Sequence, residues 1–159
     1  MNTAISDWNR VCRYIARFNV LEQVLQSEPI IFGQRDSILS KYPSDYIDFV
    51  KQFGFPTLYL DEDIYIQFYP QSRIIQHPSH TSSFFPFATC DIEERVILGF
   101  QKEGLNFQVV SSEDNICLGK EGDFDAWMKK QTTYFLTQMS HFDFSNTNPN
   151  YRNRMERGK

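Results

Sequence analysis

The stretch of sequence that decides the fold runs from Tyr42 to Gly54 and reads YPSDYIDFVKQFG. Pro43 suits the first turn of a helix, where its missing N–H would have no partner in any case. Acidic Asp45 near the start and basic Lys51 near the end both complement the helix dipole. Apolar side chains recur on one face at Tyr46, Phe49, Val50 and Phe53. Because Gly54 matches the left-handed C′ position that closes a helix, the stretch predicts a short helix with one buried face.

Downstream of Gly54 the apolar pattern changes to an alternation of two, which is typical of strands. Apolar residues on both sides of the turn Asp61–Asp63 predict a first hairpin over Leu58–Tyr69. Further strands are predicted at Phe84–Thr89, at Arg95–Phe100 and Leu105–Val110 around the turn Lys102–Gly104, and at Ile116–Leu118 after a turn at Ser111–Asn115. The polar, proline-containing stretch Pro70–Ser83 predicts a loop.

Both ends of this block are predicted to be helical. Apolar residues recur at steps of three and four from Ile5 to Phe18, and Leu25 could prolong that stripe until Pro29 ends it. Asp123 can cap a last helix whose face holds Phe124, Trp127, Met128, Gln131, Tyr134 and Phe135. The order of elements predicts an α+β fold, a mostly antiparallel sheet of about five to six strands with N-terminal and C-terminal helices packed against it.

The length of 159 residues predicts one domain. We expect residues 1–139 to form it, because the apolar periodicity is lost from Ser140 onward. Residues 140–159 are rich in Ser, Asn, Pro, Arg and Gly, which predicts a polar, flexible tail.

Charge and cysteine content limit the class of protein. The net charge is −4, but residues 1–150 carry 12 positive and 19 negative side chains, a net of −7. An acidic body argues against nucleic-acid binding and suits the attraction of a basic partner. The three cysteines show no disulfide or metal spacing. Met1–Arg10 lacks the features of a signal peptide, and no apolar run is long enough to cross a membrane. We therefore expect a soluble, cytoplasmic protein.

Motifs for catalysis are weak. His77 and His80 are three residues apart, but a metal site would need further converging ligands. Cys90 or Cys117 with His141 could be a nucleophile and base, yet no signature surrounds either cysteine, and a buried cysteine acting as a small hydrophobe is the simpler interpretation. The scattered glycines form no phosphate loop. We therefore predict no catalytic residues, no metal and no cofactor.

The order of these segments resembles the SUKH superfamily, which includes bacterial toxin-immunity proteins and fungal cell-wall regulators. The segments that carry the resemblance are Tyr42–Phe49 with Gly54, the hairpin Leu58–Tyr69, Phe85–Ala88, the paired strands Arg95–Val110 and the helix opening Asp123–Trp127. They span roughly residues 30–135. The resemblance implies a non-enzymatic protein-binding function.

Acidic and aromatic residues supply the predicted interface. The predicted partner-binding residues are Asp61, Glu62, Asp63, Tyr65, Tyr69, Asp91, Glu93 and Glu94. Tyrosine is enriched where proteins bind proteins, because it offers rigid area with a polar tip. The alternative is that the acids lie in turns because turns are solvated, while the tyrosines pack on their own sheet.

Three functional hypotheses follow. The first is an immunity protein that binds and neutralises a cognate, basic, nuclease-like bacterial toxin, acting as a monomer or weak dimer without nucleic acid or membrane. The second is a regulatory or scaffolding interaction module without a toxin partner. The third is an enzyme, which a pocket with convergent titratable residues would favour.

Overall fold

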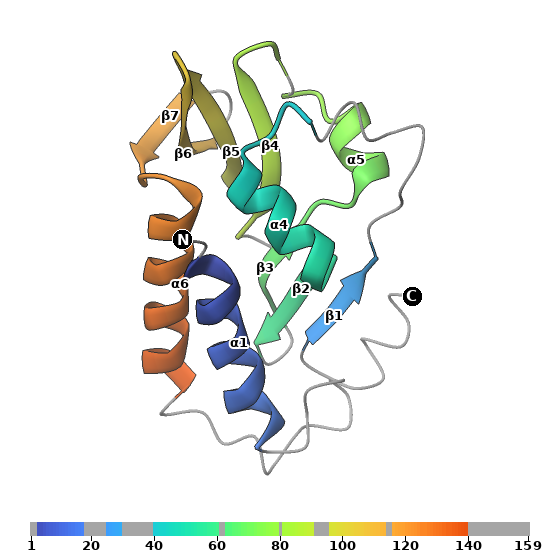
Figure 1. Cartoon of the computed structure of the whole chain (residues 1–159), viewed down its shortest axis with the longest axis vertical. Helices are drawn as coiled ribbons and strands as arrows, with labels where there is room; N and C mark the ends of the chain where they lie inside the picture. The colour runs from blue at the N-terminus through green and yellow to red at the C-terminus, as the bar shows by residue number, and fades with distance from the viewer. Residues whose placement is uncertain are drawn as a thin grey trace.

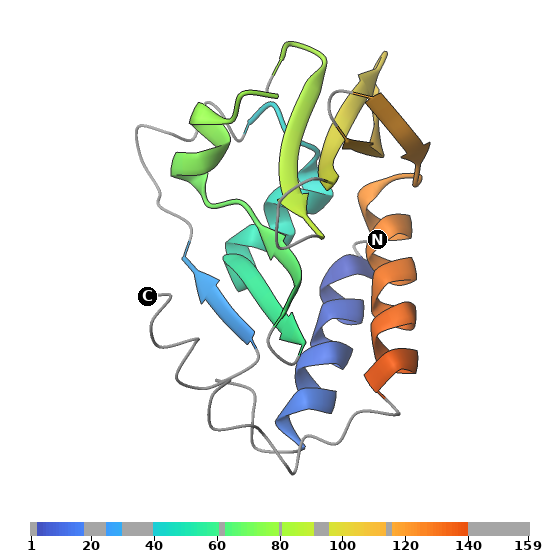
Figure 2. The ribbon, with the colours of Figure 1, turned by 180° about the vertical axis from the view of Figure 1, so that it is seen from behind.

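The sheet is a simple meander in which every strand pairs with its neighbour in sequence. The computed structural model describes residues 3–17, 25–29, 40–60, 63–79, 81–90, 96–113 and 116–139. In this part of the chain the strands are β1 (Leu25–Glu28), β2 (Phe55–Leu60), β3 (Asp63–Phe68), β4 (Phe84–Thr89), β5 (Val96–Glu103), β6 (Asn106–Glu113) and β7 (Ile116–Lys120). All six pairings are antiparallel, in the order β1 to β7 (Figure 2).

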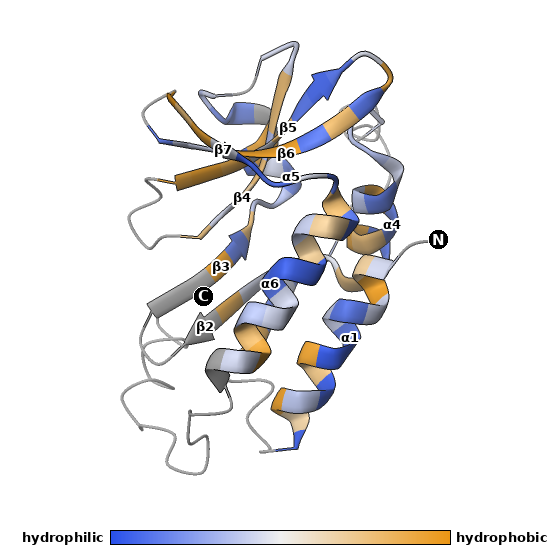
Figure 3. Cartoon of the chain, turned by 90° about the vertical axis from the view of Figure 1, so that its left-hand side faces the viewer, coloured by the Kyte–Doolittle hydropathy of each residue, from blue (hydrophilic) through white to orange (hydrophobic). Residues whose placement is uncertain are grey.

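Helices lie on one side of this sheet. They are α1 (Thr3–Ala16), α4 (Ser44–Phe53) and α6 (Phe124–Met139), with the short α5 (Gln71–Gln76) beside β4 (Figure 1). Helices α1 and α6 run side by side, and both carry hydrophobic and hydrophilic residues (Figure 3). The α+β class is thus confirmed, with seven strands instead of five to six. No helix in the described ranges has the length and apolar character needed to cross a membrane.

Helix α4 has the predicted ends. Pro43 is its N-cap residue, and the Ile47 N–H donates to the Pro43 carbonyl at 3.1 Å. At the other end the Gly54 N–H donates to the Val50 carbonyl at 2.8 Å, with φ +73° and ψ −150°. The positive φ is as predicted, but ψ lies outside the left-handed helical region. A Cβ at Gly54 would lie 2.3 Å from the Glu28 carbonyl oxygen, so glycine also lets β1 approach.

The core is built from aromatic rings between α4, α6 and the sheet. Tyr46 of α4 lies 5.3 Å from the Phe100 ring, and Phe87 stacks on Phe100 at 4.3 Å. Trp127 of α6 meets Phe87 edge-on at 5.2 Å. Each of these rings is fully buried. Edge-to-face and stacked pairs are the favoured geometries of aromatic packing, so one mutually supporting cluster joins the helices to the sheet.

Two local predictions were wrong. Leu25 does not prolong the first helix but begins β1, where it pairs with Leu58 across an antiparallel ladder. Pro70–Ser83 is not simply a loop, because α5 begins directly after Pro70. The Pro70 carbonyl accepts the N–H groups of Arg73 and Ile74, each at 3.0 Å, and the Ile74 side chain is fully buried. At Leu25 a pairing distant in sequence outweighs the local pattern, whereas α5 is held by local bonds to Pro70 and by the burial of Ile74.

Candidate protein-binding groove

Most of the predicted interface lies outside the described residues. This applies to Asp61, Glu62, Asp91, Glu93 and Glu94, and also to the tail 140–159. For Asp63 and Tyr65 the structure describes the backbone, which belongs to β3. The acidic hairpin surface therefore stays a prediction.

Tyr69 is a correction to the predicted interface. Its side chain is fully buried, so it is not an exposed contact for a partner. The ring lies 4.9 Å from the His77 ring, and the Arg73 guanidinium lies 4.9 Å from the ring centroid. Burial raises the pKa of its hydroxyl. Through these contacts with Arg73 and His77, Tyr69 joins the end of β3 to α5 and the residue that closes it.

Of the residues weighed for catalysis or metal binding, the structure describes His77, half-buried Cys90 and Cys117. His77 packs on Tyr69 and its Nδ1 accepts the Ser79 N–H at 3.1 Å, whereas His80 and His141 lie outside the described ranges. Within those ranges no three His, Cys, Asp or Glu side chains could hold a metal together. Cys117 is exposed, so the expectation that it is buried was wrong. Burial raises the pKa of the Cys12 thiol to about 11, which keeps it protonated at neutral pH.

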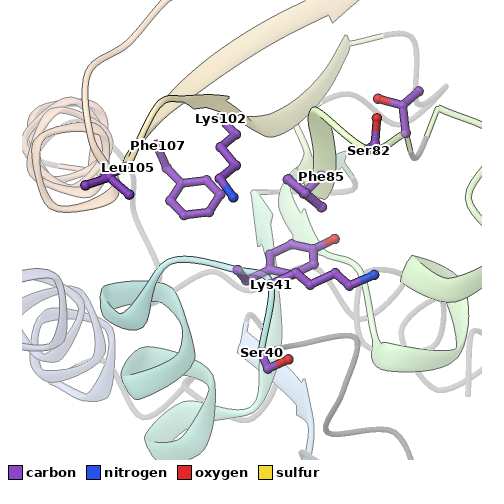
Figure 4. A pocket seen from close by; sticks show the side chains of 9 residues that line it. Ser40, Lys41, Ser82, Phe85, Lys102, Leu105 and Phe107 are labelled. Atoms are coloured by element: carbon purple, nitrogen blue, oxygen red, sulfur yellow. The ribbon is translucent and has the colours of Figure 1, made fainter.

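A large open hollow lies beside the hairpin that joins β5 to β6. Its volume is about 840 Å³, and it is lined by Ser40, Lys41, Tyr42, Thr81, Ser82, Phe85, Lys102, Leu105 and Phe107 (Figure 4). Figure 4 shows the Lys102 side chain beside the Phe107 ring, with Lys41 across the hollow. The lining thus combines cations, hydroxyl groups and apolar side chains.

The β5–β6 hairpin positions the rim of this hollow. Lys102 and Phe107 are cross-strand partners, so their side chains lie on the same face of the sheet. The turn places Gly104 at φ +63°, and Leu105 follows it with 97% of its surface exposed. An apolar side chain this exposed gains no burial within the chain, so it is available to a partner.

A short turn before β4 forms the second wall. The Thr81 hydroxyl oxygen accepts the Phe84 N–H at 3.0 Å and the Ser83 N–H at 3.3 Å. The Thr81 N–H donates to the Phe84 carbonyl at 2.9 Å, and the Lys102 N–H donates to the Ser83 carbonyl at 3.0 Å. These bonds tie the turn to β5, so the two walls of the hollow form one unit.

The floor is aromatic and fixed from below. The Tyr42 ring packs on Phe85 at 5.5 Å and on Tyr46 at 5.1 Å. Its buried hydroxyl donates to the Pro86 carbonyl at 2.7 Å, and burial raises its pKa. Pro86 lies at a β-bulge of β4, which is where an inner strand tolerates proline. Tyr42 therefore supplies shape to the hollow, while its polar atom is used inside the core.

A second hollow of about 410 Å³ adjoins the first. The two share Tyr42, Leu105 and Phe107, but the second carries Asp45 and Asp123 at the starts of α4 and α6. Burial and the neighbouring carboxylates, Asp125 first, raise the pKa of Asp45. Asp123 caps α6 as predicted, because its Oδ1 accepts the Ala126 N–H at 2.8 Å.

We call these two joined hollows the hairpin groove. Its apolar centre has lysines on one side and carboxylates on the other, the arrangement of a protein contact with an apolar middle and a charged rim. Sequence reasoning treated Lys102–Gly104 only as a turn and so missed the groove. The available signal was Leu105, a large apolar residue directly after a turn glycine.

Compared with protein-family models, curated proteins and solved structures, the chain matches none of them.

Proposed function

We propose that this chain is a non-enzymatic, cytoplasmic immunity protein that binds and neutralises a cognate bacterial toxin. The observation that carries the proposal is the exposure of Leu105 at the centre of the hairpin groove. Leu105 stands on a short turn between two paired strands, and its neighbours Phe107 and Tyr42 extend the apolar area below it. The sequence resemblance to the SUKH superfamily and the acidic charge of residues 1–150 support a basic toxin as the partner.

The chemistry of the groove favours binding over catalysis. A catalytic pocket brings a nucleophile or base within hydrogen-bond reach of a second titratable group. The first hollow contributes two lysines and three hydroxyl groups from Ser40, Thr81 and Ser82, and no His, Cys, Asp or Glu belongs to its lining. Such donors can position a partner, and in the second hollow the Asp123 carboxylate is used to cap α6 by accepting the Ala126 N–H. A regulatory or scaffolding module without a toxin partner is the alternative, and the same groove would serve it.

The test is co-expression of the chain with toxin domains encoded next to its gene. A stable, stoichiometric complex that protects the cells is the expected result. Leu105→Ala should weaken the complex about fivefold or more, because truncating a central apolar contact costs more than about 1 kcal/mol of binding free energy. Leu118→Ala removes an equally large side chain that is 56% exposed on β7, outside the groove, and should leave affinity unchanged.

Three results would contradict different parts of the proposal. Failure of every neighbouring domain to be toxic or to bind would exclude the immunity function. Capture of several weak, harmless partners would favour the regulatory module. Equal effects of Leu105→Ala and Leu118→Ala would mean that the hairpin groove is not the contact surface.

A further inference from the structure

We propose that the hollow between Lys41 and Lys102 binds a carboxylate of the partner protein, an Asp or Glu side chain whose apolar neighbour packs on Leu105 and Phe107. This inference rests on the proposed function, which supplies a protein partner. It adds the chemistry of one contact, and it assigns that contact to the lysine side of the hairpin groove.

The charge of the hollow carries the first step. Lys41 and Lys102 are both exposed and both line it, and none of its lining residues is acidic. Among the described residues, the ion pairs of other lysines lie elsewhere, Lys120 with Glu103 at 3.2 Å and Lys130 with Glu121 at 2.6 Å. Of the described residues that line the hollow, an anion would therefore meet two cations and no carboxylate, although the chain as a whole is acidic.

Hydrogen bonding carries the second step. The Thr81 hydroxyl oxygen already accepts two backbone N–H groups, from Ser83 and Phe84, so both of its lone pairs are used. Its own proton can reach the Ser83 hydroxyl oxygen, which lies 3.5 Å away, so this hydroxyl is used within the turn. A lysine ammonium has donors and no acceptor. Lys41 and Lys102 therefore present only donors, and the group that matches them carries only acceptors, as an ionised carboxylate does.

The apolar centre of the hairpin groove decides between a protein carboxylate and a small anion. Leu105 and Phe107 stand directly beside the cations, and a free phosphate ion would leave both uncovered. A residue next to an Asp or Glu in a peptide would cover them. Beyond Leu105, the carboxylates of Asp45 and Asp123 repel a second acid and attract a base. The groove thus suits a partner segment with one acid, an apolar residue and a base, as an overall basic protein can offer.

The test uses the full chain, labelled with nitrogen-15, and a defined peptide with the sequence acetyl-Gly-Leu-Glu-Leu-Gly-amide. We expect amide shifts at Thr81, Lys102 and Leu105 that saturate below about 10 mM peptide. The analogue with Gln in place of Glu should bind at least tenfold more weakly. Lys41→Gln with Lys102→Gln should abolish the preference for Glu, whereas Lys51→Gln with Lys129→Gln removes the same charge outside the groove and should preserve it.

Equal binding of the Glu and Gln peptides, or no shift at the groove with either, would overturn the inference. A response to inorganic phosphate without one to the Glu peptide would also overturn it and would make the hollow a phosphate site. The titration needs no toxin, so its result does not depend on the outcome of the co-expression experiment. Conversely, a toxin complex weakened by Leu105→Ala but not by the double lysine variant would keep the function and exclude this contact.

Discussion

Replacing Phe49 by Ala tests how α4 is held on the sheet. The Phe49 side chain is fully buried, and its ring centroid lies 5.7 Å from that of Trp8, 5.0 Å from Phe53, 5.2 Å from Phe68 and 5.6 Å from Phe124. These neighbours come from α1, α4, β3 and α6, so no single element can move to fill the space. We therefore expect a cost of about 3–5 kcal/mol in the free energy of unfolding, the range for a truncated buried phenylalanine.

Urea unfolding followed by tryptophan fluorescence measures this cost, because Trp8 and Trp127 are both buried and become exposed on unfolding. A loss of 3–5 kcal/mol corresponds to a fall of roughly 6–20 °C in the melting temperature for a chain of this size. Leu105→Ala is the control, since an exposed side chain should change stability by less than about 0.5 kcal/mol. An unchanged midpoint for Phe49→Ala would refute the packing of α4 described above.

Two further predictions concern the ends of α4. In urea unfolding, Gly54→Ala should lower the free energy of unfolding clearly more than Gly104→Ala does. Both glycines have a positive φ, which costs another residue about 1–3 kcal/mol of strain, but only at Gly54 would the added Cβ clash with a backbone oxygen. Equal losses of stability would contradict the close approach of β1. Burial and the carboxylates of Asp125 and Asp123 raise the pKa of Asp45, so its charged form is disfavoured in the folded chain. Asp45→Asn should therefore raise the free energy of unfolding at pH 7 by a few tenths of a kcal/mol, roughly the size of a like-charge pair on a helix. This advantage should close as the pH falls through the raised pKa and Asp45 takes up a proton, and a gap that persists at pH 3 would contradict the assignment.

The sequence was most informative where neighbouring residues carry the whole signal. Helix α4 could be predicted because a proline start, one apolar face and a closing glycine all fall within Tyr42–Gly54. The Asp123 cap could be predicted for the same reason, since the carboxylate reaches a backbone N–H three residues along. The antiparallel hairpins follow from period-two patterns joined by short polar turns, which leave a strand little choice but to pair with its predecessor.

The sequence was least informative where a side chain's surroundings come from distant segments. In the sequence, nothing distinguishes Tyr69 from the other tyrosines that follow the same alternating pattern. Tyr69 is buried because it packs against α5 and His77. Cys117 lies in an apolar stretch and was expected inside, but β7 is the outer strand of the sheet, so its side chain is exposed. Position in the sheet is a property of the whole meander, and no local window contains it.

The amino-acid sequence by itself determined the class of fold, the helix at Ser44–Phe53 and the acidic character of residues 1–150, because periodicity, caps and charge are local or additive properties. Tertiary structure alone decided that Lys41, Thr81 and Lys102 line one hollow and that Leu105 stands over it. Lys41 and Thr81 are forty residues apart, the first just before α4 and the second in the turn before β4. They line one hollow because β4 pairs with β5 and because the Tyr42 ring packs on Phe85. The groups that would contact a partner are thus brought together by tertiary packing, which no short stretch of sequence contains.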